Sequence, residues 1–339
     1  MLSVRGALLV DRIREEVAFF LPQRIRAIID RSPRSFWSGL EEIRLRLGRP
    51  LALHNRLGDC FLSESGEVAA AEEAYRPDAV DLEKALQLVS SSSLYAFGEE
   101  LRSGYITIPG GHRVGLCGQA VLRHGRIERL KHISGMNYRI ARQIKGAARP
   151  YLRHFLDYRR QRVYHSLLIA PPGAGKTTFL RDLARCLSDG AAELGFSGFK
   201  VAVVDERSEI AGSFQGRAQL DIGERTDLLD GCPKAEGMMM LLRSMGPEVI
   251  VTDEIGRAED AAAIEEVIHA GVTVVATAHG SSLTELRARP GLRRLLDERI
   301  FERALILGWS RGTGTVEQLC KLDERSGPVL LSGRERREG

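Results

Sequence analysis

A single stretch in the middle of the chain, residues 170–178, limits the possible folds more than any other. It reads APPGAGKTT, follows the apolar run at residues 166–169 and precedes a segment with helical spacing. A strand, a glycine-rich loop and a helix in this order form the context of a phosphate-binding loop, whose N–H groups face phosphate oxygens. Ala170 stands where the first glycine of the usual pattern sits. The stretch predicts nucleotide binding; the alternative is a glycine-rich connection with no ligand.

Each part of this loop has an expected role. The glycines allow the tight turn that directs successive backbone N–H groups toward phosphate oxygens. We expect Lys176 to reach the β- and γ-phosphates of ATP and the Thr177 hydroxyl to bind Mg²⁺. The residues expected to bind the nucleotide are Pro172, Gly173, Ala174, Gly175, Lys176, Thr177 and Thr178.

After about residue 146 the chain alternates between apolar runs and helical segments. The runs at 200–204, 248–252 and 273–277 are rich in Val and Ile. Such near-continuous runs, separated by helices, predict a parallel sheet that is covered on both faces. We therefore expect an α/β domain over residues 146–339, built as a P-loop NTPase core with a mostly parallel sheet.

The first part of the chain has a different pattern. Apolar residues recur at three- and four-residue steps in some segments and alternate with polar residues in others. The predicted elements are one or two helices over residues 1–33, broken near Pro22, a helix over 78–94, and strands over 43–47 and within 104–142. These elements predict a smaller α+β domain over residues 1–145 that precedes the P-loop domain.

Charged residues follow the predicted strands, at the edge where parallel sheets bind ligands. Asp253 and Glu254 come directly after one strand and are typical of a Walker B element. There Asp253 would hold Mg²⁺, and Glu254 would orient and polarise the attacking water. The alternative for this pair is a helix cap for the turn at residues 256–259.

A second acidic cluster, Asp205, Glu206 and Glu209, follows the neighbouring strand. It predicts positioning of water or metal at the nucleotide; the alternative is loop carboxylates paired with Arg207 and Arg225. His279 follows a third strand and is expected near the γ-phosphate as a hydrogen-bonding sensor.

Several arginines could stabilise charge that develops on the phosphates, in the same subunit or from a neighbour. They are Arg139, Arg142, Arg207, Arg225, Arg243 and Arg257, and their spacing does not choose among them. The catalytic residues predicted from the sequence are Lys176, Asp205, Glu206, Arg207, Arg243, Glu254 and His279.

Composition excludes some other classes of protein. The net charge of +4 is too small to indicate a nucleic-acid partner by itself, and no nucleic acid is expected. Apolar runs are shorter than a membrane span, and charged residues near the N-terminus interrupt any signal peptide. Five scattered cysteines without paired spacing argue against a disulfide framework or a cysteine metal site. These features predict a cytoplasmic protein.

Taken together, the motifs resemble those of the stage III sporulation protein AA family and, more distantly, of the hexameric ATPases of type II and type IV secretion systems. The stretches that carry the resemblance are APPGAGKTT, VVDERSEIAG at 203–212, KAEGMMMLLRSMGPEVIVTDEIGR at 234–257 and VVATAHG at 274–280. The resemblance implies a RecA-like or AAA+-type fold, Mg²⁺-dependent ATP hydrolysis and a hexameric ring. It also implies peripheral location at the forespore membrane, on the mother-cell side, where membrane-embedded channel proteins would be partners.

The resemblance assigns the acidic cluster to the Asp box of secretion ATPases and His279 to the His box. Two positions depart from the pattern. Secretion ATPases commonly have Gly-Glu where this chain has Asp253-Glu254, and an arginine where it has Gly256, so we expect Arg257 to replace that arginine. A P-loop ATPase that acts on nucleic acid, or a nucleotide-gated scaffold with little turnover, remains an alternative.

Overall fold

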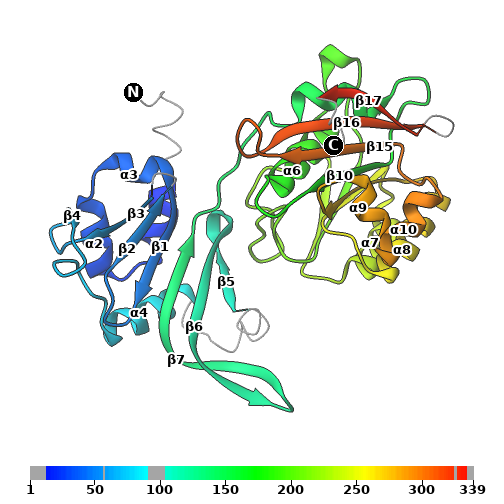
Figure 1. Cartoon of the computed structure of the whole chain (residues 1–339). Coiled ribbons are helices and arrows are strands. Elements are labelled where there is room, and N and C mark those ends of the chain that lie inside the picture. Colours follow the sequence, from blue (N-terminus) through cyan, green and yellow to red (C-terminus); the bar gives the residue numbers. More distant parts are fainter. Residues whose placement is uncertain (1–12, 56–57, 91–103, 324–326, 334–339) are drawn as a thin grey trace. The chain divides into compact units, whose positions relative to one another are not determined.

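The computed structural model describes residues 13–55, 58–90, 104–323 and 327–333. The chain divides into two compact units, Met1–Arg142 and Gln143–Gly339 (Figure 1). Each unit has its own sheet and its own hydrophobic core. Among the described residues, no helix combines the length and the apolar character that crossing a membrane requires.

Unit 1 has a seven-stranded sheet in the order β4-β3-β2-β1-β7-β6-β5, in which neighbouring strands are antiparallel. The strands are β1 Leu40–Arg46, β2 Ala52–Asn55, β3 Gly58–Leu62, β4 Val68–Ala69, β5 Tyr105–Ile108, β6 His112–Arg123 and β7 Arg126–Arg139. Residues 13–18 are helical, followed by α2 Gln23–Arg31, α3 Arg34–Gly39, α4 Ala79–Val89 and the 3-10 turn η1 Pro109–Gly111.

The sequence patterns explain these elements. Pro22 precedes α2, as expected for a residue that interrupts a helix but can begin one. Asp78 caps α4 in a capping box with Asp81, whose backbone N–H donates to the Asp78 side chain. This helix ends at Val89, and the predicted residues 91–94 lie outside the described part. The alternation in β1 buries Ile43 and Leu45 and exposes Arg44 and Arg46.

Within the described residues, unit 2 has an eight-stranded sheet in the order β12-β11-β13-β14-β10-β15-β16-β17. The strands are β10 Ser166–Ala170, β11 Val201–Asp205, β12 Thr226–Asp230, β13 Val249–Thr252, β14 Thr273–His279, β15 Arg303–Gly308, β16 Thr315–Asp323 and β17 Gly327–Gly333, with β8 Leu156–Asp157 and β9 Arg162–Val163 forming a separate pair. The helices are α6 Lys176–Asp189, α7 Lys234–Met245, α8 Ala258–His269, α9 Leu283–Arg287 and α10 Pro290–Asp297, with 3-10 turns η2 Arg149–Phe155 and η3 Ala192–Leu194.

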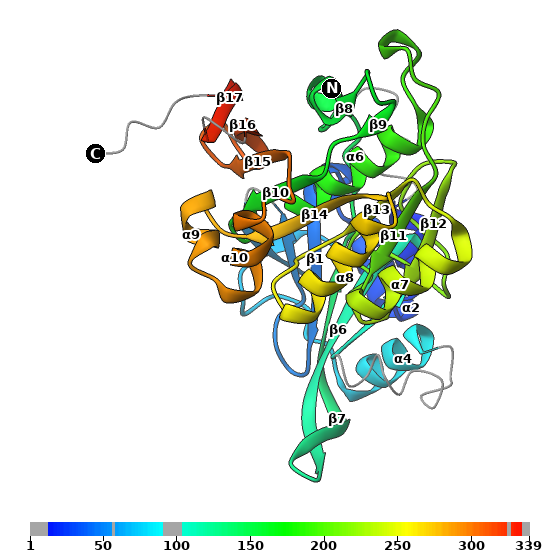
Figure 2. The same ribbon diagram turned by 90° about the vertical axis from the view of Figure 1, so that its right-hand side faces the viewer.

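Neighbouring strands from β12 to β15 are parallel, and β16 and β17 are antiparallel additions at one edge. Helix α6 covers one face of the sheet, and α7, α8 and α10 cover the other (Figure 2). The predicted α/β class with a mostly parallel sheet is therefore confirmed. Since the parallel strands all end at one edge, residues that follow β10, β11, β13 and β14 meet there.

Candidate active site

The phosphate loop lies between the end of β10 at Ala170 and the start of α6 at Lys176. Gly173 and Gly175 have φ values of +74° and +85°, a conformation that glycine adopts without strain. A Cβ atom on Gly175 would lie 3.1 Å from the Cα of Gly314. Two requirements, the left-handed backbone and the close approach, therefore favour glycine at position 175.

A turn between β15 and β16 supports this loop. The backbone N–H of Gly314 donates to the carbonyl of Ala174 at 3.1 Å, and Ala174 is fully buried. A cavity of about 420 Å³ opens beside the first residue of the loop. It is lined by Pro171, Ser281, Leu307, Gly308, Trp309, Ser310 and Glu317.

Asp253, the residue after β13, is a buried carboxylate with an unused oxygen. Its side chain is 2% exposed, and its Oδ1 has no hydrogen-bond partner among the described residues. Burial raises the pKa of Asp253 to about 6, the neighbouring Asp205 raises it as well, and Lys234 opposes the shift. An orphaned, buried carboxylate oxygen beside a phosphate loop fits a bound divalent cation.

A magnesium ion at this site would have few protein ligands. Thr177 lies in the first turn of α6, and its hydroxyl is the usual protein ligand in phosphate loops. Within the described residues, no group of three or more His, Cys, Asp or Glu side chains is arranged to hold a metal. The residues present therefore fit Mg²⁺ that takes one or two protein oxygens and completes its shell with phosphate and water, as Mg²⁺ commonly does.

Glu254 has a strained backbone and a carboxylate between two cationic or potentially cationic groups. Its φ is +43°, which is uncommon for a residue other than glycine. Its backbone N–H donates to Oγ1 of Thr277 at 2.8 Å. The carboxylate lies 3.4 Å from Nη1 of Arg207 and 3.5 Å from Nε2 of His279. Strain of this kind costs about 1–3 kcal/mol and gathers at functional sites.

His279 connects the carboxylate of Glu254 to the phosphate loop. The β10–β14 register places His279 opposite Ala170, and Nδ1 of His279 donates to the Ala170 carbonyl at 3.2 Å. Since a carbonyl only accepts, Nδ1 carries the proton and Nε2 is the nitrogen that faces Glu254. The expected role of His279 as a sensor of the γ-phosphate stays a prediction.

Asp205 is fully buried, and both of its carboxylate oxygens are used. Oδ1 accepts the N–H of Glu209 and Oδ2 accepts that of Ala211, each at 2.8 Å. Burial raises the pKa of Asp205, and these backbone donors oppose the rise. From the other side, the buried Arg181 of α6 donates to the carbonyls of Glu209 and Ile210. Asp205 thus shapes the loop that carries Glu209.

Glu206 forms an ion pair with Lys234, the first residue of α7, and Arg257 lies 3.8 Å from its other oxygen. Lys234 is 8% exposed, which is rare for a lysine without a partner. Lys234 and Arg181 were not predicted as site residues from the sequence. Each lies on a helix beside a recognised motif, but its partner is set by long-range packing, which the local pattern does not show.

Lys176 is surrounded by the charged residues of this edge. Burial lowers the pKa of its ammonium group, Glu254, Asp253 and Glu209 raise it, and Arg207 lowers it. The sheet therefore brings the phosphate-loop lysine, the strand-end carboxylates and one arginine into a single charged cluster.

Some predicted residues do not join this cluster. Arg243 lies exposed in the last turn of α7, which runs back toward the start of β13 at the opposite edge of the sheet. Arg225 donates to the carbonyl of Ser188 and not to the acidic cluster. In unit 1, Arg142 donates to the carbonyls of Trp37 and Leu40.

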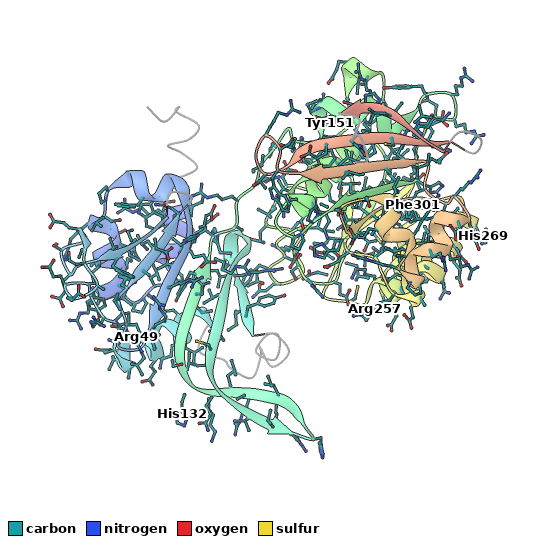
Figure 3. All side chains as sticks on the ribbon, in the orientation of Figure 1. Arg49, His132, Tyr151, Arg257, His269 and Phe301 are labelled. Carbon is teal, nitrogen blue, oxygen red and sulfur yellow. The ribbon has the colours of Figure 1, made fainter. Side chains whose placement is uncertain are left out.

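The strand-end pair Asp253-Glu254 does not cap the following helix. Asp260 accepts the backbone N–H groups of Gly256 and Arg257 at 3.1 and 3.0 Å and so caps α8. Arg257 and His269, labelled in Figure 3, mark the two ends of this helix. The structure therefore does not support the capping alternative.

Comparison with known proteins gives one extensive family match. Residues 11–328 match the family described as "Sporulation stage III, protein AA". Stage III sporulation protein AA of Bacillus subtilis (strain 168) is 44% identical over 309 residues, which cover 91% of this chain and 95% of that protein. An uncharacterized protein, ycf45, of Cyanidium caldarium is 29% identical over 174 residues, covering 50% of this chain and 47% of that protein.

Two solved structures are also similar in fold. The Legionella pneumophila ATPase DotB has a TM-score of 0.49 and 16% identity, over 88% of this chain and 75% of its own. The pilus retraction motor PilT with bound ADP has a TM-score of 0.48 and 13% identity, over 95% of this chain and 81% of its own.

Proposed function

The chain belongs to the sporulation stage III, protein AA family, and we propose that it is a Mg²⁺-dependent ATPase that converts ATP and water to ADP and phosphate. The observation that carries this proposal is the meeting of a phosphate loop with the strand-end groups of β11, β13 and β14 around Lys176. These are the parts that phosphoryl transfer requires: a phosphate cradle, a metal ligand and a carboxylate for water.

In this proposal the phosphates lie against the N-terminus of α6. The N–H groups of residues 173–178 and the helix dipole attract the anionic oxygens, and Lys176 neutralises charge on the β- and γ-phosphates. Thr177 and Asp253 would hold Mg²⁺, which when bound withdraws charge from the phosphate oxygens. Within the protein, Lys234 only partly compensates the charge of the buried Asp253 carboxylate. Bound Mg²⁺ would supply the remaining positive charge.

Glu254 is the residue we assign to the attacking water. Its carboxylate can accept a hydrogen bond from water and orient the oxygen toward the γ-phosphorus while the bond to the β-phosphate oxygen breaks. Arg207 and His279 fix the direction of this carboxylate, and the fixed backbone of Glu254 limits its movement. In this proposal Asp205 and Arg181 act as positioning residues, since they hold the loop that carries Glu209.

The remaining parts of the proposal concern assembly and place. Arg243 is exposed at the far edge of the sheet, so it could stabilise charge only on a nucleotide bound by another subunit. Such a role requires an oligomer, for which we propose a hexameric ring. We further propose that the ATPase lies in the mother-cell cytoplasm at the forespore membrane. There it would energise or gate a channel formed by membrane-embedded sporulation proteins.

The decisive experiment measures phosphate release by the purified full chain with ATP and Mg²⁺, together with its mass in solution with and without nucleotide. We expect turnover that Lys176→Ala abolishes, because ATP binding is lost, and that the exposed Arg293→Gln leaves unchanged. If the chain binds ATP but releases no phosphate, alone or with membrane partners, it acts as a nucleotide-gated scaffold and not as an ATPase.

A further inference from the structure

The hairpin of β6 and β7 extends beyond the rest of its sheet, as both ribbon views show (Figures 1 and 2). Strand β5 pairs with β6 only as far as Gly115, and β1 pairs with β7 only from Gly135 onward. Residues 119–131, which we call the arm, pair only with each other among the described residues. His124 and Gly125 form its two-residue turn, both at positive φ, as favoured hairpin turns require.

A bulge separates the arm from the sheet. The register shifts between Cys117 and Gln119, and His132 has a φ of +48° at this point (Figure 3). A Cβ atom on Gly118 would lie 2.8 Å from the carbonyl oxygen of His132, so only glycine fits. Bulges bend strands and increase twist, which directs the arm away from the sheet at a fixed position.

The two faces of the arm differ in chemistry. Residues directly opposite each other in an antiparallel pair share a face. Leu122 stands opposite Ile127, and Ala120 opposite Leu130, so these four apolar side chains share one face; a second register shift, between Val121 and Leu122, makes Glu128 the extra residue on the β7 side. Leu122 is 63% exposed and Ile127 49% exposed, whereas Leu130 packs against the core of unit 1. The apolar face therefore continues outward from the core and ends in an exposed pair near the tip.

The other face and the tip are basic. Val121 stands opposite Arg129, and Gln119 opposite Lys131, and both basic side chains are exposed. The arm contains the basic residues Arg123, Arg126, Arg129 and Lys131, and one acidic residue, Glu128. Glu128 lies 3.2 Å from Arg123 and so neutralises only one of these charges.

We propose that the arm binds an anionic lipid surface, with Leu122 and Ile127 at the boundary of the acyl chains and the basic side chains at the headgroup phosphates. An amphipathic basic segment binds a membrane by burying its apolar face and by attraction to anionic lipids. Nucleic acid would neutralise the basic face but would leave Leu122 and Ile127 in water. The unpaired backbone edges of a two-stranded ribbon limit insertion to the interface, where water and headgroups satisfy them. This inference is independent of ATP hydrolysis.

The test is sedimentation of the full chain with vesicles. We expect binding to an equal mixture of phosphatidylglycerol and phosphatidylcholine, weaker binding at high salt, and little binding to phosphatidylcholine alone. Each basic residue contributes about five-fold near an anionic surface. Arg129→Gln with Lys131→Gln should therefore weaken binding by about twenty-five-fold, and Leu122→Asp with Ile127→Asp by at least about ten-fold.

Matched controls lie elsewhere on the chain. Val68→Asp changes an apolar residue that is 58% exposed on β4 of the same unit, and Arg293→Gln removes an exposed charge from α10. Both should leave vesicle binding unchanged. Circular dichroism checks that each variant folds, and Leu122→Trp should show a blue-shifted emission with anionic vesicles.

Three results would overturn the proposal. One is absence of binding to anionic vesicles by the unmodified chain. The second is that the arm variants and the control variants lose vesicle binding equally, or that neither set loses it. The third is unchanged vesicle binding together with a changed mass in solution, which would assign the arm to contact with a second copy of the chain.

Discussion

Thr277 holds Glu254 in its left-handed backbone conformation. The Thr277 hydroxyl accepts the N–H of Glu254 at 2.8 Å, and its carbonyl accepts the N–H of Ile255 at the same distance. Thr277 is fully buried in β14, the strand that also carries His279. Neighbouring strands thus fix the position of the carboxylate that we assign to water.

Removing the Thr277 hydroxyl should weaken the connection between Glu254 and strand β14. Thr277→Val keeps the shape but leaves the Glu254 N–H without its acceptor, which costs about 1–2 kcal/mol of unfolding free energy. We expect phosphate release to fall about ten-fold while ATP affinity stays within two-fold, because the phosphate loop is untouched. Thr277→Ser, which retains the hydroxyl, should keep most of the activity. Equal turnover in the valine and serine variants would contradict this coupling.

Glu254→Gln should separate binding from hydrolysis. The amide keeps the size of the side chain but loses the negative charge that polarises water, so phosphate release should fall by about 10²–10⁴-fold. ATP binding, measured by calorimetry, should persist. Glu259→Gln, an exposed change in the first turn of α8, is the matched control and should retain full turnover. Full ATPase activity in the Glu254→Gln protein would refute the assignment of this residue.

The site shows clearly what sequence can and cannot predict. The phosphate loop and the strand-end carboxylates were predictable, because glycine spacing and apolar runs determine local structure and parallel strands share one edge. The hydrogen bond between Glu254 and Thr277 was not predictable, because periodicity identifies the buried face of a strand but not the residue of the neighbouring element that contacts it. Lys234 was missed for the same reason.

Arg243 and strand β12 show two places where local sequence patterns carry little information. Arg243 was predicted to act in the same subunit or from a neighbour; α7 runs antiparallel to the strands and carries its last turn to the opposite edge, so action from a neighbouring subunit stays the prediction. Strand β12 was not predicted, because its residues are only half-buried at the sheet edge and include two aspartates. Propensity and burial are weakest as signals at such edges.

The unfolding free energy should respond to pH through Asp253. Its pKa is about 6 in the folded protein, above the ordinary value of 3.8, so folding favours the neutral form. Between those two pH values the folded state binds more protons than the unfolded state, and stability contributed by this group rises as pH falls through about 6. At pH 8 the ionised carboxylate therefore destabilises the free protein, by up to about 3 kcal/mol.

Asp253→Asn tests this linkage. Without nucleotide or Mg²⁺, urea denaturation should show a more stable variant at pH 8, and the difference from the unmodified chain should shrink toward pH 4. Addition of ATP and Mg²⁺ should stabilise the unmodified chain more than the variant, because a metal ligand has been lost. A stability difference that does not change with pH would argue against a buried, ionised Asp253.

The ion pair of Lys234 with Glu206 predicts that substitutions of the two residues have coupled effects on the unfolding free energy. Lys234→Met leaves Glu206 with only the more distant Arg257, at 3.8 Å, and removes the positive charge that opposes the high pKa of Asp253. Breaking a buried pair from one side costs about 3–5 kcal/mol, and solvent access to Glu206 should reduce this to about 2 kcal/mol. The double variant Lys234→Met with Glu206→Leu removes both charges and should recover part of that loss. Denaturation of the two single variants and the double variant gives the coupling energy, and simple additivity would show that the pair does not act as a unit.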